Sequence, residues 1–83
     1  MNTDIWASMT DVFRDVLGDD RLTLTPTTTA SDVEGWDSIT HVMIIVGIES
    51  RFAIKLSTAE VQQLKNAGEL CETIERKLQA KKK

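Results

Sequence analysis

The chain has 83 residues and a formal net charge of −3, with 41% hydrophobic and 28% charged residues. This length allows one small domain, and the apolar content is too high for a disordered chain. Four aromatic residues, no tyrosine and one proline argue against a base-stacking nucleic-acid binder and against a many-turned β-sandwich.

The charge is unevenly distributed along the chain. Residues 1–50 carry nine acids and two bases, a net charge of −7, whereas residues 51–83 carry a net charge of +4. An acidic first half argues against nucleic acid and favours partners with basic surfaces. One cysteine and one histidine cannot form an internal disulfide or a zinc site, so we expect Cys71 to be a small buried hydrophobe.

The sequence predicts neither a membrane-spanning helix nor an N-terminal secretion signal. The longest apolar run, Val42 to Ile48, is too short for a membrane span. The start MNTDIWAS has acidic and polar residues where a secretion signal needs a basic start and an apolar run. We therefore expect a cytoplasmic monomer in which residues 1–83 form a single domain, with an ordered core over about 4–79 and a basic tail over 80–83.

Residues 5–17 are predicted to form the first helix. Their apolar side chains recur at helical spacing along one face, at Ile5, Met9, Val12, Phe13, Val16 and Leu17. Thr3 is a suitable N-cap for this helix. Residues 18–36 lack a helical period and contain five threonines, so we expect a long irregular connection with Leu22 and Leu24 as its anchors to the core.

Residues 38–51 are predicted to form the second helix, with Asp37 as its N-cap. The segment is rich in β-branched residues, but its length exceeds that of most buried strands. Apolar residues cover several faces of this helix, and a protein this small cannot bury them all. We therefore expect some of Met43, Ile44 and Ile45 to be exposed, which suggests docking or ligand binding.

The remaining chain predicts two more helices. Residues 52–56 look extended, and Ser57-Thr58-Ala59-Glu60 has the spacing of a capping box that begins a short helix ending near Leu64. Asn66 begins the last helix with the same spacing to Glu69. The predicted fold is an all-α four-helix bundle with a short third helix and a long loop between helices one and two.

The segment Asp37-Ser38-Ile39 lies where the long loop meets the second helix. Ser38 is expected at the first helical position and exposed, where unpaired backbone N–H groups and the positive end of the helix dipole favour a bound anion. Considered alone, Asp37 and Ser38 are better explained as capping residues with no further role.

The wider pattern resembles the acyl carrier protein family over about residues 5–78. The resemblance rests on Asp37-Ser38-Ile39 at a helix start, on Ile48-Glu49-Ser50-Arg51-Phe52 with Ile54 after it, and on Asn66-Ala67-Gly68-Glu69-Leu70. It implies a carrier and not an enzyme, in which Ser38 receives 4′-phosphopantetheine from coenzyme A. Asp37 would help a phosphopantetheinyl transferase to bind metal and to orient the serine. The other implied partners are an acyl- or aminoacyl-loading enzyme and a downstream synthase or transferase, as in fatty acid or polyketide biosynthesis.

Two features differ from many fatty-acid carriers. The second helix is largely apolar where those carriers have several carboxylates, and Trp36 precedes the motif where many have a small residue. We therefore expect a specialised stand-alone carrier with apolar docking and a dedicated partner. Gly47 would allow a neighbouring helix or a partner to approach closely. The residues expected to contact a partner or the acyl group are Trp36, Ile39, His41, Met43, Ile44 and Ile48.

Two other classes of function are consistent with these residues. A non-carrying helical adaptor would bind a partner through the apolar face of the second helix. A small hydrolase would use Ser38 with His41, three residues later on the same helix face, although no orienting acid is evident. The cargo and the pathway do not follow from the sequence, because the loading enzyme selects the cargo.

Overall fold

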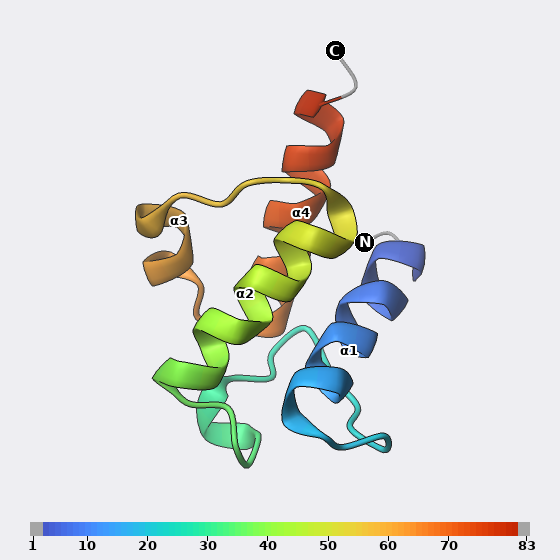
Figure 1. Ribbon diagram of the computed structural model, residues 1–83, viewed down its shortest axis with the longest axis vertical. Helices are drawn as coiled ribbons and strands as arrows, with labels where there is room; N and C mark the ends of the chain where they lie inside the picture. The colour runs from blue at the N-terminus through green and yellow to red at the C-terminus, as the bar shows by residue number, and fades with distance from the viewer. Residues whose placement is uncertain (1–2, 82–83) are drawn as a thin grey trace.

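A computed structural model describes residues 3–81 as a small helical bundle. Helix α1 spans Thr3–Leu17, α2 spans Ser38–Phe52, α3 spans Thr58–Gln63 and α4 spans Ala67–Lys81, and a 3₁₀ helix, η1, spans Ala30–Asp32. No strand occurs among the described residues. Helix α1 packs against α2 and α4, and the short α3 lies on the other side of α2 (Figure 1). The predicted all-α architecture with a short third helix is confirmed.

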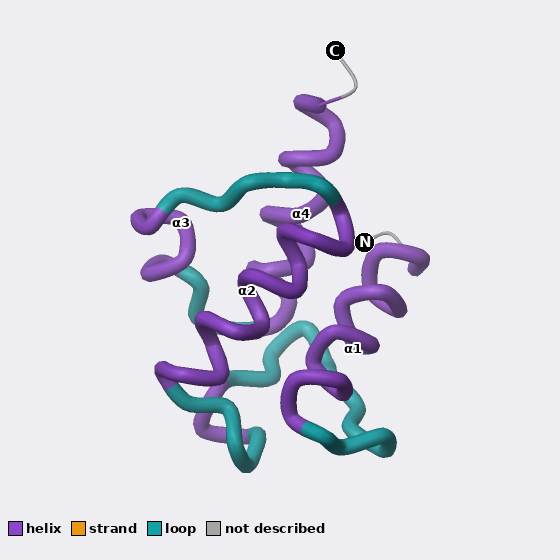
Figure 2. The backbone as a smooth tube through the Cα atoms, in the orientation of Figure 1, coloured by secondary structure: helices purple, strands orange, loops and turns teal. Residues whose placement is uncertain are grey.

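The connection between α1 and α2 is the longest loop of the described chain (Figure 2). It is irregular, as predicted, except for η1, which the sequence pattern did not indicate. Leu24 is buried and Leu22 is half-buried, which confirms both predicted anchors. The loop also reaches the start of α4, where the Pro26 and Thr28 carbonyls accept hydrogen bonds from the backbone N–H groups of Gly68 (3.0 Å) and Ala67 (2.8 Å).

The helix starts follow the predicted capping residues closely. Ser57 and Glu60 form the capping box of α3, and the Asn66 side chain accepts a hydrogen bond from the Glu69 N–H at 2.8 Å. The prediction that Thr3 caps α1 is wrong, because Thr3 is itself helical.

The end of α2 lies one residue beyond its predicted position, at Phe52. Ala53 then adopts the left-handed conformation (φ 54°) that ends many helices. The Lys81 ammonium donates a hydrogen bond to the Ala53 carbonyl at 2.8 Å, so this member of the predicted basic tail belongs to α4 and contacts the end of α2. Lys82 and Lys83 lie outside the described residues.

The core lies between α1, α2 and α4. Its fully buried side chains are Met9, Phe13, Ile44, Ile48, Leu70, Cys71 and Ile74. Cys71 is buried as predicted, and burial together with the nearby Glu75 raises the pKa of its thiol to about 11, so the thiol stays protonated at neutral pH. A Cβ at Gly47 would lie 2.7 Å from Val12 Cγ1. The close approach expected at Gly47 is therefore made by α1.

The exposed face of α2 is apolar. Of the three residues expected to include exposed ones, Met43 is 51% exposed, whereas Ile44 and Ile45 are buried. We call the exposed row the apolar stripe, and it consists of Ile39, Val42, Met43 and Val46. Among the described residues, none of the helices combines the length and the apolar character needed to cross a membrane.

Candidate functional site

The start of α2 is fixed by a reciprocal cap. Asp37 Oδ1 accepts hydrogen bonds from the backbone N–H groups of Ile39 and Thr40, both at 3.0 Å. In return, the Thr40 hydroxyl accepts a bond from the Asp37 N–H at 2.7 Å and donates to the Gly35 carbonyl at 2.6 Å. Ser38 is the first residue of the helix and is exposed, as predicted.

This cap uses two of the N–H groups that were expected to be available to bind an anion at the helix start. The N–H groups of Ile39 and Thr40 are bonded to Asp37, so the expectation that unpaired N–H groups favour an anion is wrong for these two. The bonds from the Thr40 and Ile39 N–H groups hold the pKa of Asp37 below its ordinary value, because they favour the charged form. Asp37 is therefore a carboxylate at neutral pH, and an anion on Ser38 would depend on other donors.

An open cleft of about 570 Å³ lies beside Ser38, between the start of α2 and the α3 region. Asp37, Ser38, His41 and Val42 line its α2 side, and its opposite side is lined by Thr58, Val61, Gln62, Leu64 and Lys65. Most of the exposed lining is apolar. The site thus combines an exposed hydroxyl with a largely apolar cleft of the size that holds small ligands.

Trp36 and His41 form a pair at this cleft. The Trp36 indole N–H donates to His41 Nδ1 at 3.1 Å, and the two rings are stacked with centroids 6.0 Å apart. The indole is only 8% exposed and contacts the Phe13 ring edge-to-face at 4.9 Å between centroids. Trp36 therefore belongs to the core, and it also lines the cleft, so its predicted contact with a partner or the acyl group stays a prediction.

The remaining predicted contact residues divide into exposed and buried sets. Ile39 is 74% exposed and Met43 is 51% exposed, so both can contact a partner. Ile44 and Ile48 are fully buried, which excludes them from surface docking, and their role in an acyl pocket between helices stays a prediction. Val42 and Val46 are also exposed but are not among the predicted contact residues, although their spacing from Ile39 predicts that all three share one face of the helix.

The geometry of His41 contradicts the hydrolase hypothesis. In a serine hydrolase triad, an acid accepts a hydrogen bond from Nδ1–H and orients the ring for the serine. Here Nδ1 is itself an acceptor, and its donor is an indole. The arrangement lacks the feature that turns a serine and a histidine into a nucleophile and its base.

Comparison with known proteins identifies the family. The family model described as phosphopantetheine attachment site matches residues 7–74. The chain belongs to the phosphopantetheine-carrying acyl carrier protein family. A solution structure of a holo acyl carrier protein from Geobacter metallireducens is 38% identical, with a TM-score of 0.88 over 95% of this chain and 91% of that one. Among curated proteins, none matches this sequence.

This membership confirms several predictions. The protein is a carrier and not an enzyme, and its prosthetic group is 4′-phosphopantetheine. Its interactions are with enzymes that modify it and with synthases that use what it carries. The site fits such a group, because the exposed Ser38 hydroxyl lies at the edge of a cleft that is mostly apolar. Once bound, the arm supplies a terminal thiol, so the chain needs no activated nucleophile of its own.

Proposed function

We propose that Ser38 bears the 4′-phosphopantetheine arm and that the protein carries acyl or aminoacyl groups as thioesters for a biosynthetic pathway. The observation that supports this most directly is the position of Ser38. It is the exposed first residue of α2, beside the cleft and within the matched region 7–74. A flexible arm fixed at this point raises the effective concentration of the cargo at a docked enzyme.

Asp37 supports the same proposal in a second role. The hydrogen bonds that its carboxylate accepts all end on Oδ1. Its second oxygen, Oδ2, is thus left for another ligand, and we assign it to the metal of the transferase that modifies Ser38. Carboxylate oxygens are the ligands that Mg²⁺ prefers.

The apolar stripe is the surface that we assign to partner enzymes. It begins next to Ser38, and α2 carries no charged residue from Ser38 to Ile48 if His41 is neutral. Ile39 and Val42 are the exposed members of the stripe nearest Ser38 in the helix, so we expect an enzyme that reaches Ser38 to contact them. We therefore assign the carrier to a dedicated partner with an apolar docking surface and not to general fatty-acid synthesis.

Intact-mass analysis tests the attachment site. The apo protein is incubated with a broad-specificity phosphopantetheinyl transferase, Mg²⁺ and coenzyme A. We expect the wild type to gain one phosphopantetheine mass and Ser38→Ala to gain none. Ser31→Ala, at another exposed serine of the same region, is the matched control and should be loaded like the wild type. An unchanged wild-type mass, or a loaded Ser38→Ala variant, would contradict the proposal.

A further inference from the structure

The contact between Trp36 and His41 fixes where His41 carries its proton. An indole nitrogen can only donate a hydrogen bond, and Trp36 donates to His41 Nδ1 at 3.1 Å. Nδ1 must therefore be unprotonated, and a neutral His41 carries its hydrogen on Nε2. Because the indole is buried against Phe13, the core holds the donor in place and thereby selects the tautomer.

His41 lies where a donor could serve the group on Ser38. The two residues are three positions apart on α2, so their side chains are neighbours on one helix face. Both line the same cleft. The N–H groups of Ile39 and Thr40 are already bonded to Asp37, so these backbone donors cannot serve a phosphate without breaking the cap.

Two charged side chains share this cleft with His41. Asp37 is a cap acceptor and repels an anion, while Lys65 lies on the opposite side, between α3 and α4, and is exposed. An exposed lysine is a mobile point charge. His41 differs from Lys65 in that a hydrogen bond and ring stacking with Trp36 hold it in a fixed position.

We propose that His41 is a positioning residue for the arm: its Nε2–H donates a hydrogen bond to a phosphate oxygen of the phosphodiester on Ser38, with Trp36 holding the required tautomer. This inference rests on the proposed attachment to Ser38. The hydrogen bond restrains the first part of the arm at the cleft, next to the surface where a partner docks. It is a restraint that the N–H groups of Ile39 and Thr40, which are bonded to Asp37, do not supply.

Nuclear magnetic resonance of the apo and loaded protein tests the proposal above neutral pH. In the apo protein, we expect the ¹⁵N signals of His41 to show an unprotonated Nδ1 and a protonated Nε2. Loading should move the Nε2–H proton downfield and slow its exchange with water. The ³¹P signal of loaded His41→Phe, which keeps a ring against Trp36 but has no donor, should differ from that of the wild type. His41→Gln, which retains an N–H donor at similar reach, should restore it in part.

Two further variants separate the tautomer held by Trp36 from the charge of Lys65. Trp36→Phe should yield a mixture of His41 tautomers, and Lys65→Gln should leave the His41 signals and the ³¹P signal unchanged. The proposal is overturned if a protein shown by mass to be loaded has an unmoved Nε2–H and the same ³¹P signal in wild type and His41→Phe. It is also overturned if only Lys65→Gln moves the ³¹P signal. Failure of the attachment itself is seen separately, as the absence of added mass.

Discussion

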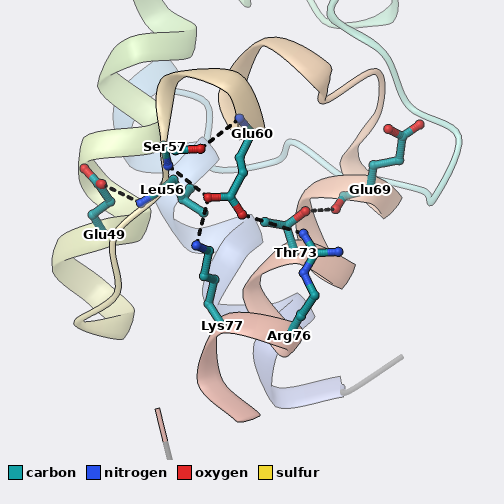
Figure 3. Close-up of polar contacts among 8 residues, drawn as sticks. All are labelled: Glu49, Leu56, Ser57, Glu60, Glu69, Thr73, Arg76 and Lys77. Carbon is teal, nitrogen blue, oxygen red and sulfur yellow. Dashed lines mark hydrogen bonds and ion pairs between the residues drawn. The ribbon is translucent and has the colours of Figure 1, made fainter. Parts of the chain in front are cut away.

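Glu60 joins the short helix α3 to α4 through several polar contacts (Figure 3). Its Oε1 accepts a hydrogen bond from the Ser57 N–H at 3.0 Å and lies 2.8 Å from the Lys77 ammonium. Its Oε2 lies 3.7 Å from the Arg76 guanidinium. Lys77 and then the Ser57 N–H are the main causes that lower the pKa of Glu60 from 4.5 to about 2. One carboxylate thus both completes the cap of α3 and attaches that helix to the bundle.

We expect the free energy of unfolding to depend on pH through the protonation of Glu60. Because its pKa is lowered in the folded state, the folded protein binds this proton less readily than the unfolded chain. The stabilisation is therefore complete above about pH 4.5 and lost as the pH falls toward about 2. We expect Glu60→Gln to lower the melting temperature at neutral pH. The difference in melting temperature between this variant and the wild type should shrink as the pH falls over this interval. Circular dichroism melts across the pH series measure it.

The matched control for Glu60 is Glu72→Gln, which removes an exposed carboxylate from α4. This variant should follow the wild-type dependence through the same acid interval. A gap between Glu60→Gln and the wild type that stays constant from neutral pH to about pH 2 would contradict the assigned role.

The start of α4 is capped by a loop that lies about forty residues earlier in the chain. The Gly68 N–H donates to the Pro26 carbonyl at 3.0 Å and the Ala67 N–H to the Thr28 carbonyl at 2.8 Å. The Thr28 hydroxyl also accepts a bond from the Thr25 N–H at 2.8 Å, which fixes the turn. The first N–H groups of α4, which have no partner within the helix, are thereby paired.

Gly68 should tolerate no side chain. A Cβ there would lie 2.5 Å from the Pro26 carbonyl oxygen, a backbone atom that cannot move without disturbing the loop. We expect Gly68→Ala to reduce the free energy of unfolding by about 1–3 kcal/mol, as overpacking does elsewhere. Urea unfolding followed by circular dichroism measures this change.

Gly47→Ala is the comparison for Gly68→Ala. Its Cβ would meet the Val12 side chain at 2.7 Å, and a side chain can shift more readily than backbone. Alanine also gains about 1 kcal/mol of helix propensity over glycine in a helix interior. We expect a smaller loss than for Gly68→Ala, and the reverse order would show that the loop does not restrain the start of α4.

The sequence predicts the starts of α2, α3 and α4 correctly, whereas the cap predicted for α1 at Thr3 is wrong. Asp37, Ser57 and Asn66 all cap helices as expected, since each acts on N–H groups two or three residues away. The 3₁₀ helix η1 was not predicted. It is one turn long and its cap pair, Thr29 and Asp32, lies in a segment without apolar periodicity.

Net charge and exposed apolar surface should control different steps of docking. The net charge of −7 over residues 1–50 attracts basic partners over a distance and is screened by salt. The apolar stripe acts only after contact. We expect the association rate constant with a phosphopantetheinyl transferase to fall as salt rises, while the dissociation rate constant changes little. Surface plasmon resonance over a salt series measures both.

Variants of the apolar stripe separate the two steps further. Val46 is 58% exposed, and covering its exposed part is worth about 1 kcal/mol, or about fivefold in affinity. Val46→Ser should therefore raise the dissociation rate constant about fivefold and leave the salt dependence of association unchanged. Ala7→Ser, at an exposed position of α1, is the control. Dissociation that speeds up strongly with salt in the wild type would contradict apolar docking.

Features that depend on residues close together in the chain follow from the sequence alone. Helical spacing, caps and length are sufficient for the four helices, and the motif at the start of the second helix is sufficient to place Ser38 at an exposed helix start, as the structure confirms. The sequence also predicts the burial of Cys71. At Gly47 the absence of a side chain predicts a close approach but does not identify the element that approaches.

Which helix faces are buried depends on how the helices pack together, and this does not follow from the sequence of any one helix. The second helix is apolar on several sides, so its periodicity could not distinguish Ile44 and Ile48, which enter the core, from Val42 and Val46, which do not. Trp36 is buried because Phe13, twenty-three residues earlier, provides a ring to pack against. These outcomes depend on how the other helices pack against α2. The hydrophobic effect that drives this packing is non-directional, so the pattern of one helix does not determine which of its apolar faces is buried.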